Sequence, residues 1–509
     1  AFQDALNLIQ YTRQSVFLTG KAGTGKSTFL RYVCENTKKK HVVLAPTGIA
    51  AINAGGSTMH SFFKLPFYPL LPDDPNLSLQ RGRIHEFFKY TKPHRKLLEQ
   101  IELVIIDEIS MVRADIIDAI DRILRVYSHN LREPFGGKQL LLVGDVFQLE
   151  PVVKNDEREI LNRFYPTPYF FSARVFGQID LVSIELQKVY RQTDPVFVGV
   201  LDQIRNNTAG AADLQLLNTR YGSQIEESEA DMYITLATRR DTVDSINEKK
   251  LAELPGDPIT FEGVIEGDFP ESSLPTSQEL VLKPGAQIIF IKNDFDRRWV
   301  NGTIGVIAGI DEEEETIYVI TDNGKECDVK RESWRNIRYR YNEKTKEIEE
   351  EVLGSFTQYP IRLAWAITVH KSQGLTFSRV VIDFTGGVFA GGQAYVALSR
   401  CTSLDGIQLK KPINRADVFV RPEIVNFAGR FNDRQAIDKA LKQAQADVQY
   451  AAASRAFDKG DMEECLEQFF RAIHSRYDIE KPVPRRFIRR KLGVINTLKE
   501  QNKKLKEQM

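Results

Sequence analysis

The sequence has few of the residues that build disulfide frameworks or metal sites. Its four cysteines, Cys34, Cys327, Cys401 and Cys465, are far apart and form no Cys-x-x-Cys pair, which argues against zinc and against structural disulfides. Its seven histidines show no His-x-x-x-His spacing, and no apolar run approaches the roughly 18 residues that cross a membrane. We therefore expect a soluble, intracellular protein with no membrane partner, located in the cytoplasm or nucleoid if the source is bacterial.

An excess of charge of either sign is also missing. Lys plus Arg and Asp plus Glu both number 69 among 509 residues, so the formal net charge is zero. A net charge of zero gives no overall positive potential that would indicate a nucleic-acid partner. Any nucleic-acid site must therefore be local. The chain is long enough for roughly three or four domains of ordinary size.

The most informative stretch that is present runs from Gly20 to Ser27 and fits G-x-x-x-x-G-K-[ST] between a strand pattern and a helix pattern. Glycines let backbone N–H groups face a triphosphate, Lys26 reaches the outer phosphates, and the Ser27 hydroxyl can hold Mg²⁺. The alternative, a chance glycine turn, is expected on the order of 0.02 times in a chain of this length. The predicted nucleotide-binding residues here are Gly20, Gly23, Thr24, Gly25, Lys26, Ser27 and Thr28.

Two further strands end in polar groups that suit phosphoryl transfer. Asp107 and Glu108 follow the apolar run 103–106, where Asp107 would hold Mg²⁺ through its water shell and Glu108 would polarise the attacking water. Gln148 follows the apolar run 140–143 and can reach a γ-phosphate or its water. The alternative for the Asp–Glu pair is an ordinary charged strand terminus.

The organisation of the chain predicts an α/β protein with insertions. Apolar runs at 16–18, 42–45, 103–107, 140–145 and 181–186 alternate with helical patterns, which is typical of a parallel sheet flanked by helices. Residues 64–96 are rich in proline and aromatics and interrupt this rhythm. Strand signals at 232–237 and 380–384 suggest a second α/β unit. Between them, runs at 287–291, 305–310 and 316–320 with two Asn-Gly turn signals suggest a small β-barrel.

Further motifs give the sequence a resemblance to superfamily 1 helicases. They comprise 45–51, 186–192, 368–377 and 395–402, in the expected order. The segment 55–62, the run Asp107–Met111 and the helix carrying Phe197, Leu201, Ile204 and Arg205 narrow the resemblance to the petite-integration-frequency (PIF) helicases, relatives of the RecD-type enzymes. It covers roughly residues 1–425.

The resemblance implies two RecA-like P-loop motor domains, at 1–63 with 97–185 and at 186–280 with 363–430. It also implies a wedge insertion at 64–96 and a Src-homology-type β-barrel inserted at 281–362, followed by a helical C-terminal region at 431–509. The wedge would split the duplex, although its aromatics could equally pack against the first domain.

The family motifs also imply roles for single residues. Gln3 matches the position that recognises adenine, which makes ATP the expected fuel, and Gly374 lies at the nucleotide. Arg191 and Arg400 are candidates for stabilising the charge that develops during hydrolysis, which is worth about 10³–10⁵ in rate in well-studied cases. A surface ion pair is the alternative for each arginine alone. The residues at DNA-contact motifs are Pro46, Thr47, Gly48, Thr58, His60, Phe62, Thr368, His370, Lys371 and Ser372, of which His60 and Phe62 would individually more often be core residues.

The expected function is ATP-dependent translocation along single-stranded DNA, five-prime to three-prime by resemblance, with unwinding of forked duplex and of structured DNA such as G-quadruplexes. Roles in repair, recombination, replication or telomere maintenance would follow from that activity, and the protein is expected to work as a monomer. Two alternatives stay open at this point. One is a superfamily 1 RNA helicase, and the other is a P-loop switch that binds a protein partner and unwinds nothing.

Overall fold

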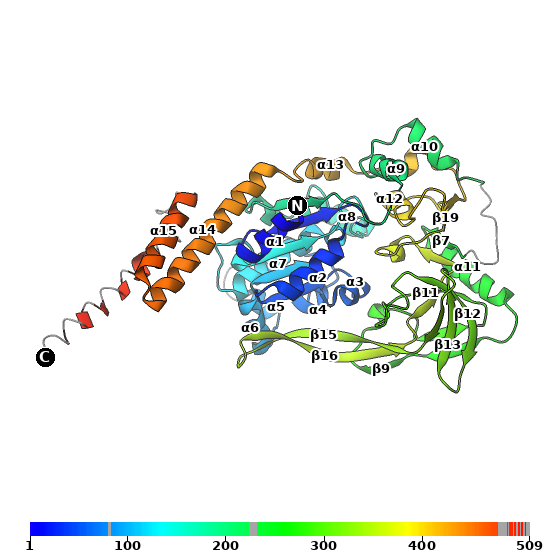
Figure 1. The fold of residues 1–509 in the computed structure, drawn as a ribbon, viewed down its shortest axis with the longest axis horizontal. Helices are drawn as coiled ribbons and strands as arrows, with labels where there is room; N and C mark the ends of the chain where they lie inside the picture. The colour runs from blue at the N-terminus through cyan, green and yellow to red at the C-terminus, as the bar shows by residue number, and fades with distance from the viewer. Residues whose placement is uncertain are drawn as a thin grey trace.

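A six-stranded parallel sheet forms the first α/β unit (Figure 1). The computed structural model describes residues 1–79, 83–192, 194–222 and 232–476, with scattered positions between 486 and 504. The strand order is β3-β2-β4-β5-β1-β6, and the central strands are buried on both faces, as continuous apolar runs of this kind require. The strands are β1 (Val16–Gly20), β2 (His41–Ala45), β3 (Ser57–Thr58), β4 (Leu103–Ile106), β5 (Gln139–Val143) and β6 (Val182–Leu186). All five predicted strands of this unit are confirmed.

Helices cover both faces of this sheet. They are α1 (Phe2–Tyr11), α2 (Lys26–Asn36), α3 (Gly48–Ala54), α4 (Met59–Phe63), α7 (Ala114–Tyr127) and α8 (Asn155–Leu161). The segment that interrupts the rhythm holds only a 3-10 turn at Pro75–Leu77, α5 (Arg83–Phe87) and α6 (Lys92–Gln100), whose first turn contains Pro93. The prolines therefore exclude a long helix there, as expected. Several apolar side chains of this segment lie in the core of the first unit, namely Leu65, Leu70, Leu77, Ile84, Phe88 and Tyr90.

The second α/β unit is built on a four-stranded parallel sheet with the order β18-β7-β19-β20. Its strands are β7 (Ile234–Ala237), β18 (Ala366–Thr368), β19 (Val380–Asp383) and β20 (Ile407–Leu409), and its helices are α9 (Pro195–Arg205), α10 (Ala211–Asn218), α11 (Arg240–Glu253) and α12 (Gln393–Leu398). The strand signals at 232–237 and 380–384 are confirmed. Because β18 comes from beyond the intervening β-rich region, that region is an insertion in this unit.

The β-rich insertion contains three small antiparallel sheets. The strands are β8 (Ile259–Glu262), β9 (Val264–Gly267), β10 (Glu279–Leu282), β11 (Gln287–Phe290), β12 (Ile304–Asp311), β13 (Thr316–Thr321), β14 (Glu326–Val329), β15 (Glu332–Asn342), β16 (Glu347–Gln358) and β17 (Ile361–Leu363). Phe261, Leu280 and Leu282 share a core with Ile288 and Phe290. The region thus begins before the expected boundary at residue 281, because β8 to β10 precede it.

A long hairpin of β15 and β16 extends from this insertion to the first unit (Figure 1). The Tyr339 hydroxyl accepts a hydrogen bond from the Val43 N–H at 3.2 Å, beside the point where the two-residue strand β3 ends its pairing with β2. Tyr339 and Tyr341 are buried in the core of the first unit. This extension was not expected from the sequence, where a compact barrel was predicted.

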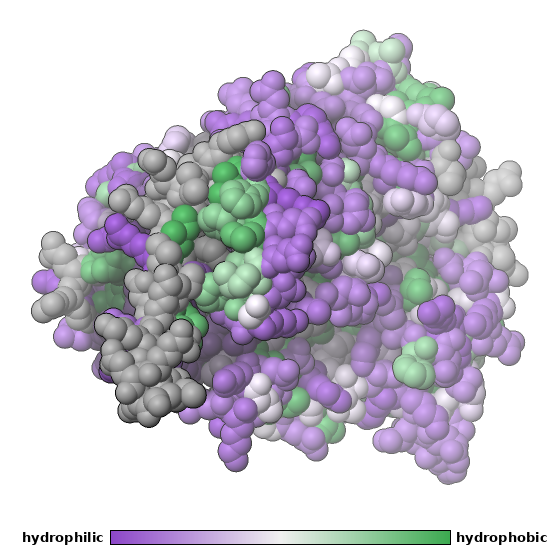
Figure 2. All heavy atoms as spheres, turned by 60° about the vertical axis from the view of Figure 1, so that its left-hand side comes forward, coloured by the Kyte–Doolittle hydropathy of each residue, from purple (hydrophilic) through white to green (hydrophobic). Residues whose placement is uncertain are grey.

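Three helices follow the second unit: α13 (Pro422–Ala428), α14 (Arg434–Lys459) and α15 (Met462–Arg476). α14 packs against α1 and forms a hairpin with α15 that projects from the body of the molecule (Figure 1). The face on that side is mostly hydrophilic, with small hydrophobic patches (Figure 2). Leu466 and Phe470 of α15 are about half exposed.

Candidate functional site

The carboxyl ends of β1, β5 and β4 lie next to one another in the first sheet and deliver the predicted catalytic groups to one edge. The phosphate loop leaves β1, the pair Asp107 and Glu108 follows β4, and Gln148 follows β5. Gly25 has a φ of 88° with open space where a Cβ would stand, and it begins α2 without a side-chain cap. The N-terminus of α2 is therefore left open toward the site, as anion binding requires.

A cavity of about 800 Å³ lies over this edge, between the two α/β units. Its lining includes the predicted Lys26, Glu108, Gln148, Arg191 and Arg400. Further lining residues are Phe2, Ala22, Gly23, Thr24, Gly25, Ser27, Thr28, Tyr190, Gly374 and Thr376. The tertiary structure thus brings residues from both halves of the chain into one site.

Lys26 is held in place by the phosphate loop itself. Its Nζ donates hydrogen bonds to the carbonyl oxygens of Gly20 at 2.6 Å and Lys21 at 3.0 Å. Burial lowers the pKa of Lys26, and the carboxylates of Asp145 and Glu108 oppose that shift. A partly desolvated ammonium of this kind interacts strongly with any anion that enters the loop.

Asp107 and Glu108 form a closely coupled acidic pair. The Glu108 N–H donates to Asp107 Oδ1 at 2.9 Å, and Glu108 has a left-handed backbone with a φ of 50°. Burial, followed by the neighbouring Asp107 carboxylate, raises the pKa of Glu108 to about 7, and burial also raises the pKa of Asp107. Such shifts are typical of catalytic clusters, where charged groups are gathered in a desolvated place.

The two predicted arginines approach the site from the far side of the cavity. Arg400 is 1 % exposed, and its guanidinium donates to Gln148 Oε1 at 3.5 Å and to the Leu375 carbonyl at 3.4 Å. Arg191 donates to the Ser399 carbonyl at 3.3 Å. Burial lowers the pKa of both arginines, that of Arg400 to about 9. An arginine keeps its charge at neutral pH, so both side chains bring positive charge to the cavity. A surface ion pair is therefore not the role of either side chain here.

The residues present fit a nucleoside triphosphate with its magnesium ion. The cavity has the size of a ligand pocket, and the open start of α2 with Lys26 offers donors and positive charge to phosphates. Ser27 lies at that helix start, and the buried Asp107 carboxylate stands beside the cavity, so these two would hold Mg²⁺. Among the described residues no group of three or more His, Cys, Asp and Glu forms a metal site independent of a nucleotide.

Gln3, the residue expected at the adenine, does not lie at the cavity. The Gln3 side chain is exposed and donates to Asn7 Oδ1 at 2.9 Å on the same helix, and it does not line the cavity. Phe2 does line it, with its ring against Phe29 at 4.9 Å. Phe2 is not among the nucleotide-binding residues predicted from the sequence. The one feature that could have indicated it is its position next to Gln3.

Eight of the ten predicted nucleic-acid contacts are exposed or half-buried. Pro46, Thr47 and Gly48 begin α3, and a Cβ added to Gly48 would clash with Ser273 of the β-rich insertion. Lys371 is exposed, and His370 stacks near Phe389 at 6.4 Å. The remaining accessible or half-buried members are Thr58, His60 and Thr368. The threonines also have a structural role, because Thr47 and Thr58 cap α3 and α4.

Two predicted contacts are buried and correct the expectation. The Phe62 ring is 4 % exposed and packs against Phe63 at 4.8 Å and Tyr339 at 6.1 Å. Ser372 is fully buried, and its hydroxyl donates to the Val369 carbonyl at 2.7 Å. In this arrangement neither side chain can touch a nucleic acid, because core packing and a local hydrogen bond occupy them.

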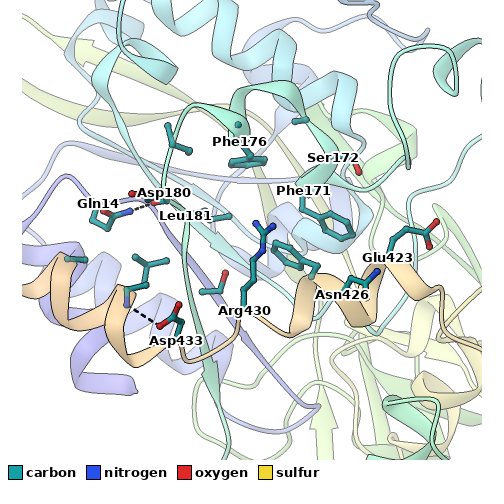
Figure 3. A pocket seen from close by; sticks show the side chains of 18 of the residues that line it. Gln14, Phe171, Ser172, Phe176, Asp180, Leu181, Glu423, Asn426, Arg430 and Asp433 are labelled. Atoms are coloured by element: carbon teal, nitrogen blue, oxygen red, sulfur yellow. Dashed lines mark hydrogen bonds between the residues drawn. The ribbon is translucent and has the colours of Figure 1, made fainter.

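A second cavity, of about 910 Å³, lies away from the phosphate loop, where α13 and α14 cover the first unit (Figure 3). Arg430 and Asn426, from the segment around α13, and Phe171, from the first unit, line it (Figure 3). None of the predicted catalytic residues lines it. Its larger size does not make it the reaction site, because the convergent charged groups are in the smaller cavity. Within the described part of the chain, no helix has the length and apolar character to cross a membrane.

Comparisons with known proteins all find Pif1 helicases. A family model described as PIF1-like helicase matches residues 2–206. The ATP-dependent DNA helicase Pif1 of Campylobacter jejuni is 34 % identical over 414 residues, which is 78 % of this chain and 88 % of that protein.

Solved structures agree with the sequence matches. Pif1 from a Bacteroides species in complex with ADP-AlF4 is 41 % identical, with a TM-score of 0.77 over 86 % of this chain and 97 % of that one. Pif1 from Bacteroides bound to single-stranded DNA is 41 % identical, with a TM-score of 0.60 over the same shares. The two parallel sheets and these neighbours fit a RecA-like helicase fold.

Proposed function

Because the chain belongs to the PIF1-like helicase family, we propose that it uses ATP hydrolysis to move five-prime to three-prime along single-stranded DNA and to separate duplex strands. One observation carries the proposal: a single cavity joins Lys26 and Glu108 of the first unit to Arg191 and Arg400, which follow β6 and α12. A nucleotide held there is sensed by both units. Its hydrolysis can therefore change their separation.

Each part of ATP hydrolysis is assigned to particular residues of this chain. Lys26 and the start of α2 bind the phosphates, Glu108 accepts hydrogen bonds from the attacking water, and Gln148 orients that water. Arg191 and Arg400 stabilise the charge that spreads over the phosphates. When bound at Ser27 and Asp107, Mg²⁺ would neutralise part of the phosphate charge.

The finer points of the expected architecture and biology belong to the same proposal. We assign the wedge to the 64–96 segment, and a Src-homology-type barrel to the strands of the β-rich insertion apart from its long hairpin. The DNA track uses the exposed members of the predicted set, and Gln3 or Phe2 contacts adenine. The monomeric state, the intracellular location and the action on G-quadruplexes in repair, recombination, replication or telomere maintenance remain predictions.

A strand-displacement assay on matched five-prime-tailed and three-prime-tailed DNA duplexes tests the proposal directly. We expect ATP-dependent unwinding of the five-prime-tailed substrate alone, and ATPase stimulation by single-stranded DNA well above that by RNA of the same sequence. Greater stimulation by RNA would assign the protein to RNA substrates. Turnover that no nucleic acid stimulates would favour a P-loop switch.

The wedge assignment predicts a difference between two phenylalanines of one segment. Phe67 is 84 % exposed and stacks on His60 with ring centroids 5.0 Å apart, whereas Phe88 is 2 % exposed. Phe67→Ala should lower the rate of duplex unwinding by about 10- to 100-fold, since base stacking on an aromatic is worth ~1–3 kcal/mol. The ATPase rate that single-stranded DNA stimulates should stay unchanged. Phe88→Ala should instead lower the melting temperature and both activities, because it opens a core cavity. Equal losses of unwinding and ATPase in a stable Phe67→Ala protein would refute the wedge.

The arginine assignment predicts a catalytic defect with intact binding. Arg191→Ala and Arg400→Ala should each lower kcat by about 10²–10³-fold, below the full effect of a single arginine because the two guanidinium groups share the developing charge. The affinity for ATP should change much less, since Lys26 and the helix start hold the ground state. Turnover and nucleotide binding are measured on the same variants. If both fall together, the arginines bind the ground state and are not catalytic.

A further inference from the structure

The phosphate loop is attached to residues that follow β6. The Lys21 ammonium pairs with the Asp202 carboxylate of α9, and both side chains are about three-quarters buried. The Gly23 carbonyl accepts a hydrogen bond from the Tyr190 N–H at 2.9 Å. The loop that binds the phosphates is thus attached to the second half of the chain through the Lys21 side chain and the Gly23 carbonyl.

A third attachment comes from α12. The Ala22 N–H donates a hydrogen bond to the hydroxyl of Tyr395 at 3.1 Å. Tyr395 is 4 % exposed and does not line the nucleotide cavity; it borders a small separate space behind the loop with Asp202. Burial, and then the Asp145 carboxylate, raise the pKa of Tyr395, so the hydroxyl keeps its proton. The contact is therefore a neutral hydrogen bond between the two units.

The same helix supports Arg400. The Arg400 Nε donates to the Val396 carbonyl at 3.2 Å, next to Tyr395 in the chain, while its Nη2 approaches Gln148 Oε1. A continuous path of bonded groups runs from the Ala22 N–H through Tyr395 and α12 to Arg400. The position of the guanidinium relative to the loop consequently depends on where α12 is held.

We propose that Tyr395 is a positioning residue, whose hydroxyl fixes α12 against the phosphate loop and so places Arg400 over the phosphates. This inference rests on the catalytic role proposed for Arg400. Without the hydroxyl the loop still presents its inner N–H groups and Lys26 to a nucleotide. α12 then holds Arg400 in the reactive position for a smaller share of the time. The defect therefore lies in turnover and not in nucleotide binding.

The test is Tyr395→Phe, which keeps the ring and removes only the hydroxyl. With saturating single-stranded DNA, kcat should fall about three- to tenfold, the range that one buried neutral hydrogen bond gives. The KM for ATP should stay within about twofold. Tyr165→Phe is the matched control: Tyr165 is equally buried, and its hydroxyl donates to Asp118 at 2.9 Å within the first unit. It should show a similar change in melting temperature and an unchanged kcat.

A double-mutant cycle separates positioning from a merely structural role. If Tyr395 acts through Arg400, Tyr395→Phe should have no further effect on kcat in an Arg400→Ala protein. An unchanged kcat in Tyr395→Phe, a rise in KM alone, or full additivity with Arg400→Ala would each overturn the inference. An unchanged kcat in Arg400→Ala by itself would remove the arginine role on which the inference rests, and that result is distinct from the other three.

Discussion

Lys26→Ala is expected to abolish measurable ATP turnover, with a loss of about 10³ or more in kcat/KM. The Lys26 ammonium is the positive side chain within the phosphate loop that reaches the cavity, so its removal weakens both phosphate binding and the stabilisation of developing charge. Binding of single-stranded DNA should be retained, because none of the predicted nucleic-acid residues lines the cavity. ATPase rates and DNA affinity of the same preparation check both expectations.

Lys39→Ala is the matched control for this variant. Lys39 is also a lysine of the first unit whose Nζ donates to protein acceptors, the Ile9 carbonyl and Gln139 Oε1, both at 2.6 Å. Its replacement should lower the melting temperature by leaving those acceptors unpaired, with normal turnover per folded molecule. If Lys26→Ala kept more than about a tenth of the parent turnover, the phosphate-loop assignment would be wrong.

Glu108→Gln is expected to separate binding from catalysis, with a fall in kcat of about 10²–10⁴. The amide has the size of the carboxylate but cannot take up a proton from the attacking water. Nucleotide affinity should be preserved or increased, because burial and Asp107 both disfavour the charge that the substitution removes. Single-turnover hydrolysis and equilibrium nucleotide binding measure the two effects separately.

The control for this prediction is Glu157→Gln. Glu157 is another largely buried carboxylate of the first unit, paired with Arg113 at 3.3 Å, and it does not line the cavity. We expect normal turnover and a modest loss of stability from the broken pair. Comparable kcat values for Glu108→Gln and the parent protein would remove Glu108 from the catalytic groups.

The burial of aromatic residues in the 64–96 segment could not be predicted from the sequence. Phe67 and Phe88 have the same side chain and belong to the same segment, yet one is exposed and the other lies in the core. Local pattern cannot distinguish them, because burial depends on how the segment folds back onto α7 and α6. Phe62 was placed on the DNA track for the same reason, although Tyr339 of a distant hairpin covers it.

The sequence by itself determined five strands of the first parallel sheet, two strands of the second, and the first half of the nucleotide site. The phosphate loop, Asp107 with Glu108, and Gln148 each follow a buried apolar strand, so their positions are set by local chain geometry and by the adjacency of parallel strands. Such signals are contained in a few consecutive residues and can be read without the fold.

The family motifs implied that Arg191 and Arg400 of the second half lie at the nucleotide, but only the tertiary structure decided from which side this half meets the phosphate loop. Arg400 enters the cavity while Tyr395, on the short helix that precedes it, holds the loop from behind. It also decided that Phe2 and not Gln3 lines the cavity, and that the hairpin of β15 and β16 packs on the first unit. These outcomes depend on contacts between segments far apart in the chain, whose side-chain packing no local pattern encodes.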